Sequence, residues 1–262
     1  MRRVLRAFRT LEPFATTQQI YAGALIFARL ASLVMTMPGV GDAAVPPRIR
    51  LSFAFVLTLV LTPIIAPNLP LIPSAVSAIA GAVIKEVLIG LMIGTILRLF
   101  LTALATAGEI VSIQTTLSFA QTSAPGIAPG STTLGTFLGL IGLVLIMTTD
   151  LHHMFIAAIV RSYTIFPVTR DLPVTDATEL ALQTVSQSFK MGLQLSAPVA
   201  AFALVFNIAV GLVARVMPQF QVYFVASPLM VLFGLSIFAA TLGIVGLIWV
   251  DGYRMLLTHF TG

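Results

Sequence analysis

Residues 108–137 read GEIVSIQTTLSFAQTSAPGIAPGSTTLGTF and lie between two strongly apolar stretches of the chain. The segment carries one charge, Glu109, and its hydroxyls, amides, prolines and glycines prevent a continuous apolar helix. An unpaired backbone N–H or C=O in hydrocarbon costs several kcal/mol, so irregular backbone at membrane depth must be buried by protein or line a wet cavity. The segment therefore predicts a pore or a substrate path.

The composition is that of an integral membrane protein, or of a subunit buried within one. Of the 262 residues, 58% are hydrophobic and only 9% are charged, whereas soluble domains carry roughly 25% charged residues. Residues 51–84, 110–149 and 216–250 contain no charge at all. Each of these stretches exceeds the roughly 20 residues that span a bilayer as a helix.

The net charge of +5 comes mostly from the basic N-terminal segment 1–13, which contains Arg2, Arg3, Arg6 and Arg9. Because other charges are so few, this excess indicates membrane orientation rather than nucleic-acid binding. The chain contains no cysteine, which excludes disulfides, thiolate metal sites and cysteine nucleophiles.

The apolar pattern predicts an all-α membrane protein with about six long, partly broken helical spans in a single domain over residues 1–262. Prolines, glycines and capping residues place the helices at 14–36, 47–66, 73–116, 134–147, 154–165, 176–215 and 222–250. The stretch 73–116 is far longer than one crossing needs. Residues 251–262 are expected to form a separate tail.

Five charged residues fall inside apolar runs, where charge is expensive in a membrane: Arg29, Lys85, Glu86, Arg98 and Glu109. Arg98 and Glu109 lie about 16 Å apart along one predicted helix, so they cannot pair with each other. We expect structural pairing with neighbouring helices or subunits. A relay of protons or ions through these side chains is the alternative that the pattern leaves open.

Small and polar residues at helical spacing predict contacts between helices. Gly90 and Gly94 lie four residues apart, which lets another backbone approach closely. Asn207 is expected to make a hydrogen bond between helices. We assign these three residues and Arg215 to helix packing or buried polar pairing.

Asp150, His152 and His153 form the one cluster that resembles a metal or acid–base site. Zinc-binding helices carry histidines at i and i+4, whereas adjacent helix residues face different ways. The spacing favours an interfacial turn in which Asp150 caps the following helix. We therefore predict no catalytic residue, metal or cofactor, and no enzyme activity. A membrane-embedded hydrolase that uses this cluster is the hypothesis left open.

One large aromatic side chain, Phe119, lies in the Ser/Thr/Gln-rich part of the central segment. A single aromatic side chain can fill a wet constriction and exclude water while it remains displaceable. The sequence therefore predicts a gating role for Phe119.

Several short motifs together resemble the FliR family of type III secretion export-gate proteins, found in flagella and injectisomes. In chain order they are FARL at 27–30, MPGVG at 37–41, PPRIR at 46–50, GLMIG at 90–94, GEI at 108–110, LSFA at 117–120, NIAVGL at 207–212 and RVMPQ at 215–219. The resemblance extends over essentially the whole chain, and the order and spacing of the motifs make it specific.

The resemblance implies one copy of this chain in a hetero-oligomeric helical assembly with FliP- and FliQ-type subunits, in the bacterial inner membrane at the flagellar basal body. It also implies FlhB- and FlhA-type partners and unfolded flagellar proteins as cargo. In the family, the segment matching 114–133 plugs the pore. The plug residues here would be Leu117, Phe119, Gln121, Pro125, Gly126, Pro129 and Gly130. The family's acidic residue after LSFA is absent, and Gln121-Thr122-Ser123 follows instead.

The resemblance further implies a shallow helical funnel lifted above the bilayer plane, in which overlong helices such as 74–116 form hairpins around the pore. The alternative function is a small-solute secondary transporter. Its broken helices would place a binding site at Gly126 and Gly130, with coupling through Glu86 or Glu109.

Overall fold

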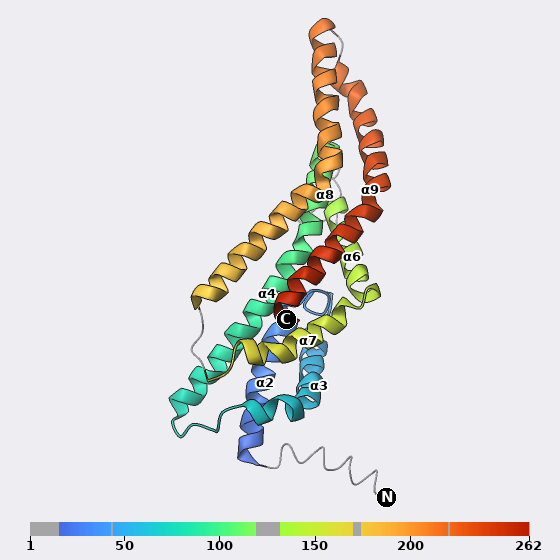
Figure 1. Ribbon diagram of the computed structural model, residues 1–262. Coiled ribbons are helices and arrows are strands. Elements are labelled where there is room, and N and C mark those ends of the chain that lie inside the picture. The colour runs from blue at the N-terminus through green and yellow to red at the C-terminus, as the bar shows by residue number, and fades with distance from the viewer. Residues whose placement is uncertain (1–15, 43, 119–131, 170–173, 220, 262) are drawn as a thin grey trace, which may run out of the picture. The chain divides into compact units, whose positions relative to one another are not determined.

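The computed structural model describes residues 16–42, 44–118, 132–169, 174–219 and 221–261. Within these ranges there is no strand, and the regular elements are α2 (Thr17–Thr36), α3 (Pro47–Ile65), the 3-10 helix η2 (Ala66–Asn68), α4 (Val76–Gln114), α6 (Thr133–Thr148), α7 (Leu151–Ile165), α8 (Val174–Val216) and α9 (Val222–Thr261) (Figure 1). The prediction of an all-α protein is confirmed.

Five of these helical segments are long and apolar enough to cross a membrane: α2, α3 with η2, α4, most of α8 and most of α9. The pair α6 and α7, interrupted at Thr149 and Asp150, gives a sixth if it is counted as one broken span. By length and composition, the prediction of about six spans is confirmed.

Local sequence signals explain where the helices begin. At α2 the Thr16 hydroxyl accepts from the Gln19 amide, and the Gln19 side chain accepts from the Thr16 amide, which is a complete capping box. Pro47 is the first residue of α3, a position where the missing N–H costs nothing. The Thr132 side chain caps α6 by accepting from the Gly135 amide.

Two of the sequence-based predictions are wrong. Residues 74–116 form no hairpin, because α4 runs without a break through 39 residues, or about 58 Å of helix. No proline or turn sequence interrupts that stretch. Residues 251–261 form no separate tail but continue α9, because Trp249, Tyr253 and Leu257 lie four residues apart and are fully buried.

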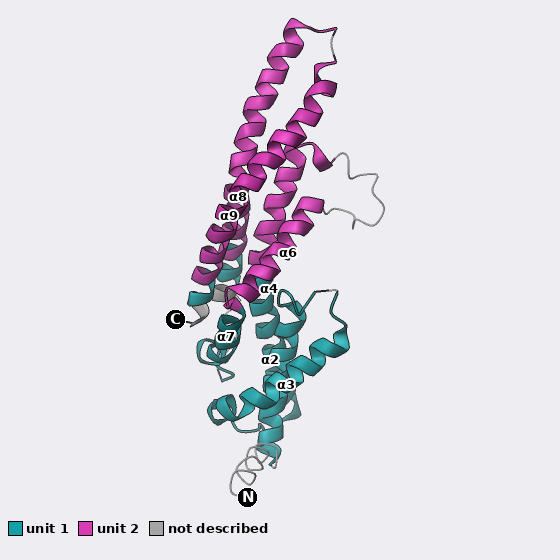
Figure 2. Cartoon of the chain, turned by 90° about the vertical axis from the view of Figure 1, so that its right-hand side faces the viewer, with its two compact units in different colours: residues 1–98, 152–182, 256–262 teal, residues 99–151, 183–255 magenta. Residues whose placement is uncertain are grey.

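The chain divides into two compact units (Figure 2). Unit 1 comprises residues 1–98, 152–182 and 256–262, and unit 2 comprises residues 99–151 and 183–255. Helices α4, α7, α8 and α9 contribute residues to both units.

In unit 1, the glycines of α4 bring its backbone against α2. A Cβ atom at Gly90 would overlap the Ser32 hydroxyl and the Arg29 carbonyl oxygen. A Cβ atom at Gly94 would overlap the Thr36 hydroxyl. Only glycine permits such an approach of two helices.

A fully buried ion pair lies at the same place in unit 1. The Arg29 guanidinium donates from Nε to Oε2 of Glu86 at 2.6 Å and from Nη2 to Oε1 at 2.9 Å. It also donates to the Ser162 hydroxyl and to the carbonyl of Phe166, and it lies 3.9 Å from the centre of the Tyr163 ring. One guanidinium thereby joins α2, α4 and α7.

Unit 2 has an aromatic core and a helical hairpin. The Tyr253 ring lies 5.2 Å from the Phe100 ring and 5.0 Å from the Trp249 ring, centroid to centroid. The Trp249 Nε1–H donates to the Phe100 carbonyl oxygen, so its buried polar atom is satisfied. Beyond Val216 the chain turns back into α9, and α8 and α9 form a hairpin in this unit (Figures 1 and 2).

We expect Gly90→Ala to destabilise unit 1 by about 1–3 kcal/mol, because the added methyl group meets backbone and side-chain atoms of α2. The free energy of unfolding in detergent measures this effect. The matched control is Gly81→Ala in the same helix, because no atom lies within 4 Å of the Cβ position there. The control should be neutral or slightly stabilising. Equal stability of the two variants would contradict the packing.

We expect Glu86→Ala to reduce the free energy of unfolding by about 3–5 kcal/mol, because it leaves the buried Arg29 charge without its carboxylate. The double variant Arg29→Met/Glu86→Leu should recover most of this loss, since it removes both charges. Chemical unfolding of the three proteins in one detergent is the measurement. A Glu86→Ala protein as stable as the parent would rule out a structural ion pair.

Candidate functional site

The structure describes both ends of the central segment 108–137 but not its middle. Phe119, Gln121, Pro125, Gly126, Pro129 and Gly130 all lie outside the described residues. Leu117, which is half-buried, precedes residues 119–131, and Thr132 follows them. The candidate site is therefore built from the residues at these two ends, all of them in unit 2.

At the N-terminal end, a threonine pair terminates α4. Thr115 is 1% exposed, and its hydroxyl donates to the Val111 carbonyl oxygen at 2.8 Å. Thr116 has φ of +60°, a left-handed conformation that non-glycine residues rarely adopt. Its amide donates to the carbonyl oxygen of Ile113. The chain therefore leaves the helix in a direction set by the backbone of Thr116.

Helix α9 holds this end of the segment in two ways. A Cβ atom at Gly234 would overlap Cγ2 of Thr115, so the absence of a side chain makes room for the threonine. The Thr116 and Ser227 hydroxyl oxygens lie 3.4 Å apart and share a hydrogen bond. The exit from α4 is thus fixed against a neighbouring helix.

At the C-terminal end, Thr132 caps α6 and the first turn of α6 packs on α4. A Cβ atom at Gly108 would lie 2.7 Å from Cα of Gly135 and 2.5 Å from the Leu134 carbonyl oxygen. A Cβ atom at Gly135 would in turn lie 3.1 Å from Cγ of Glu109. Glu109 therefore lies beside the N-terminal turn of α6, where the helix dipole favours a negative charge.

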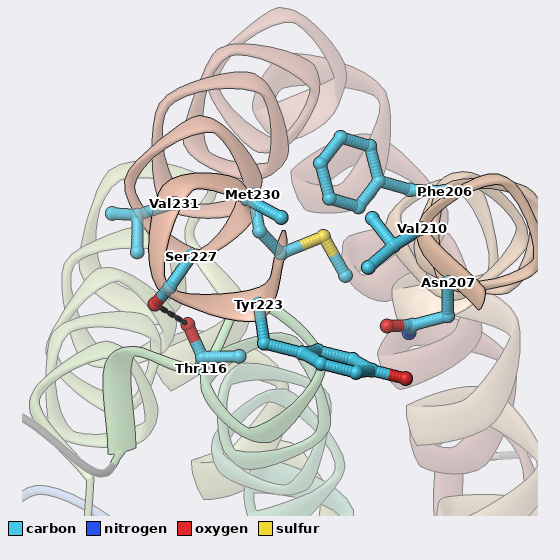
Figure 3. A pocket seen from close by; sticks show the side chains of 9 residues that line it. Thr116, Phe206, Asn207, Val210, Tyr223, Ser227, Met230 and Val231 are labelled. Carbon is cyan, nitrogen blue, oxygen red and sulfur yellow. Dashed lines mark hydrogen bonds between the residues drawn. The ribbon is translucent and has the colours of Figure 1, made fainter. Parts of the chain in front are cut away.

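An open pocket adjoins the N-terminal end of the segment (Figure 3). It has a volume of about 430 Å³ and is lined by the end of α4, by α8 and by α9. The lining residues are Thr116, Phe206, Asn207, Val210, Tyr223, Ala226, Ser227, Met230 and Val231. In Figure 3 the Tyr223 ring lies across one side of the pocket, with its hydroxyl directed toward Asn207.

The other residues singled out in the sequence lie in several places. Arg29, Glu86, Gly90 and Gly94 meet in unit 1 as described above. Arg98 pairs with Asp42 at 3.3 Å, a partly exposed contact that is worth at most about 1 kcal/mol. Asn207 lines the pocket, and Arg215 is exposed in the last turn of α8.

The break between α6 and α7 contains Asp150, which has φ of +58°. The predicted turn is present at residues 149 and 150. His152 and His153 follow within α7, with 4.1 Å between their ring centroids. The Nδ1 atom of His152 is buried without a hydrogen-bond partner. A catalytic role for the cluster stays a hypothesis.

Sequence reasoning missed the residues that hold the segment's ends. Thr115, Thr116 and Ser227 are ordinary polar residues near helix ends, and Gly234 is one of several glycines in an apolar helix. Their function depends on which helices become neighbours, and that information is not local. The sequence placed the end of this helix near residue 116, but nothing in it pointed to the contacts with Ser227 and Gly234.

Comparison with known proteins gives a near full-length relationship. Residues 20–255 match the family described as bacterial export proteins, family 1. The chain is 59% identical over 251 residues to the flagellar biosynthetic protein FliR of Caulobacter vibrioides, covering 96% of this chain and 100% of that protein.

More distant relatives carry the same name. The chain is 28% identical over 220 residues to flagellar biosynthetic protein FliR of Escherichia coli, covering 83% of this chain and 82% of that protein. It is 30% identical over 221 residues to the Aquifex aeolicus protein, with coverage of 84% and 85%. The resemblance inferred from the short motifs is therefore confirmed, and this chain belongs to family 1 of the bacterial export proteins.

Proposed function

We propose that this chain is a subunit of the flagellar protein export apparatus, embedded in the bacterial inner membrane. The observation that carries the proposal is the 59% identity to FliR of Caulobacter vibrioides over that protein's whole length. The five long apolar helices support a place within a membrane. The proposed role is transport, without enzyme chemistry.

Within that apparatus, the chain would form the export channel together with FliP- and FliQ-type subunits and pass unfolded flagellar proteins out of the cytosol. FlhB- and FlhA-type proteins would be further partners. Large apolar side chains exposed on α3 support extensive contacts with protein or lipid, among them Ile49, Phe55, Val56, Val60 and Ile64, each more than half exposed.

The central segment 114–133 would seal the closed channel, with Phe119 as the aromatic plug. Two observations support this role. Between Glu109 and Asp150 the chain carries no charge, so an unfolded cargo of any sequence would find no strong electrostatic site there. Both ends of the segment are also held by close helix contacts in unit 2, at Thr115 and Gly234 and at Gly108 and Gly135.

The transporter alternative has less support. A coupling carboxylate must be able to exchange its proton or ion with the transport path. Both oxygens of Glu86 are instead bound by the guanidinium of Arg29, with neither side chain exposed. This contact supports a structural role for Glu86, and Glu109 is the other carboxylate that the transporter would use for coupling.

Gentle detergent extraction of the tagged chain from its own cell envelope tests the proposed function. We expect a complex with one copy of this chain and several copies of two other small, strongly apolar proteins. Native mass determination and identification of the co-purifying chains give the answer. A stable monomer or a symmetric homodimer that catalyses solute uptake in vesicles would instead favour the transporter.

We expect Gly234→Val to make the assembled channel leak small solutes, because the added side chain displaces Thr115 and with it the start of the plug segment. The measurement is solute permeability of cells that contain the assembled complex. The control is Gly243→Val in the same helix, where no atom lies within 4 Å of the Cβ position.

Phe119→Ala tests the proposed plug residue independently of the contact between Thr115 and Gly234 that holds the segment. If the Phe119 variant leaks and the Gly234→Val variant does not, the plug role of Phe119 is supported. The same result would reject the role of Gly234 in positioning the start of the segment. If neither variant leaks while both assemble normally, the segment does not seal the channel.

A further inference from the structure

The pocket between α8, α9 and the end of α4 adjoins the start of the central segment but has no role in the export function proposed above. Its volume of about 430 Å³ is within the range of ligand-binding pockets. None of its nine lining residues is charged, and Phe206, Val210, Ala226, Met230 and Val231 make most of its wall apolar. A neutral, largely apolar ligand therefore fits it best.

We propose that this pocket binds an acyl chain of a membrane phospholipid, with the headgroup phosphate at Arg215. The three helices at the pocket, α4, α8 and α9, all contain segments apolar enough to cross a membrane, so lipid is an available apolar ligand at this surface. Leu204, Val205 and Ile208 on α8 and Phe224 on α9 are also exposed, so these helices carry further apolar surface outside the pocket.

The wall of the pocket suits a flexible hydrocarbon chain. Met230 is 3% exposed, and its unbranched thioether adapts to irregular apolar shapes. In Figure 3 its sulfur lies between the Ser227 side and the Phe206 side of the pocket. The hydroxyls of Thr116 and Ser227 bond to each other, so they need no polar group from the ligand.

Tyr223 and Asn207 give the pocket a polar region apart from the bonded pair Thr116 and Ser227 (Figure 3). Tyr223 is 65% exposed, and its hydroxyl is directed toward the carboxamide of Asn207 (Figure 3). A tyrosine with an apolar ring and a wet hydroxyl is typical of the membrane interface. These two groups can donate hydrogen bonds to the ester carbonyls of a lipid.

Arg215 supplies the charge that a phosphate needs. It lies eight residues after Asn207 on α8, about 12 Å along the helix, toward the turn that leads to Tyr223. Gly211 lies between them with no atom within 4 Å of its Cβ position, so the helix surface between Asn207 and Arg215 is uncovered at that point. A long arginine side chain can lie along such a surface with its charge in the headgroup region.

Photolabelling tests the proposal. The full chain is placed in nanodiscs that contain phosphatidylglycerol with a diazirine in its acyl chain, and the labelled peptides are identified by mass spectrometry. We expect labels on α8 near Phe206 and Val210 and on α9 near Met230. Ala226→Trp should fill the pocket and remove most of this label. The control is Ala240→Trp, an exposed site on the same helix outside the pocket, which should leave the label unchanged.

A second variant tests the headgroup without entering the pocket. Arg215→Gln should lower labelling by the phospholipid but not labelling by a diazirine-bearing fatty alcohol of the same chain length. Equal phospholipid labelling in the parent and in Arg215→Gln would mean that Arg215 only complements the dipole of α8 and would overturn the headgroup assignment.

Three further outcomes would reject the acyl-chain site. In the first, the label is spread evenly over the exposed helices. In the second, Ala226→Trp and the Ala240→Trp control label equally. In the third, labelling is seen in the isolated chain but disappears in the complex purified from the cell envelope, which would assign the pocket to a neighbouring subunit. None of these outcomes bears on the export function, which the co-purification tests separately.

Discussion

Close approach of helix backbones at the glycines of α4 is the constraint on which both units depend. Gly90 and Gly94 admit α2 in unit 1, and Gly108 admits the first turn of α6 in unit 2. In an apolar surrounding, the hydrophobic effect contributes little to helix association, so packing at small residues and buried polar contacts must supply it. The Arg29–Glu86 pair forms where the glycines of α4 bring α2 close. Close packing and ion pairing therefore stabilise the same contact between α2 and α4.

Much of the helical architecture could be predicted, because its signals are local. The Thr16 cap, Pro47 and the break at residues 217–221 mark helix ends in the sequence itself. The end of α9 could not be placed in this way. Asp251 and Arg254 make its last turns look polar, whereas burial of Trp249, Tyr253 and Leu257 on one face keeps the helix intact.

The candidate site was predictable in part, for the same reason. A neutral, proline-containing segment between apolar arms indicates a special function from composition alone. The partner of a given side chain depends instead on tertiary neighbours. Arg29 and Glu86 are 57 residues apart, and Thr115 meets Gly234 across more than a hundred residues, so neither contact follows from spacing.

The long separation in the Arg29 network has a consequence for how the protein is made. At about 5–20 residues per second, synthesis brings out Glu86 roughly 3–11 s after Arg29. Ser162 and the carbonyl of Phe166 follow later still. During that interval α2 carries a guanidinium that is costly to place alone in the bilayer interior. The stability of α2 in an apolar surrounding therefore depends on a helix that is made later, because α4 supplies the carboxylate that pairs with Arg29.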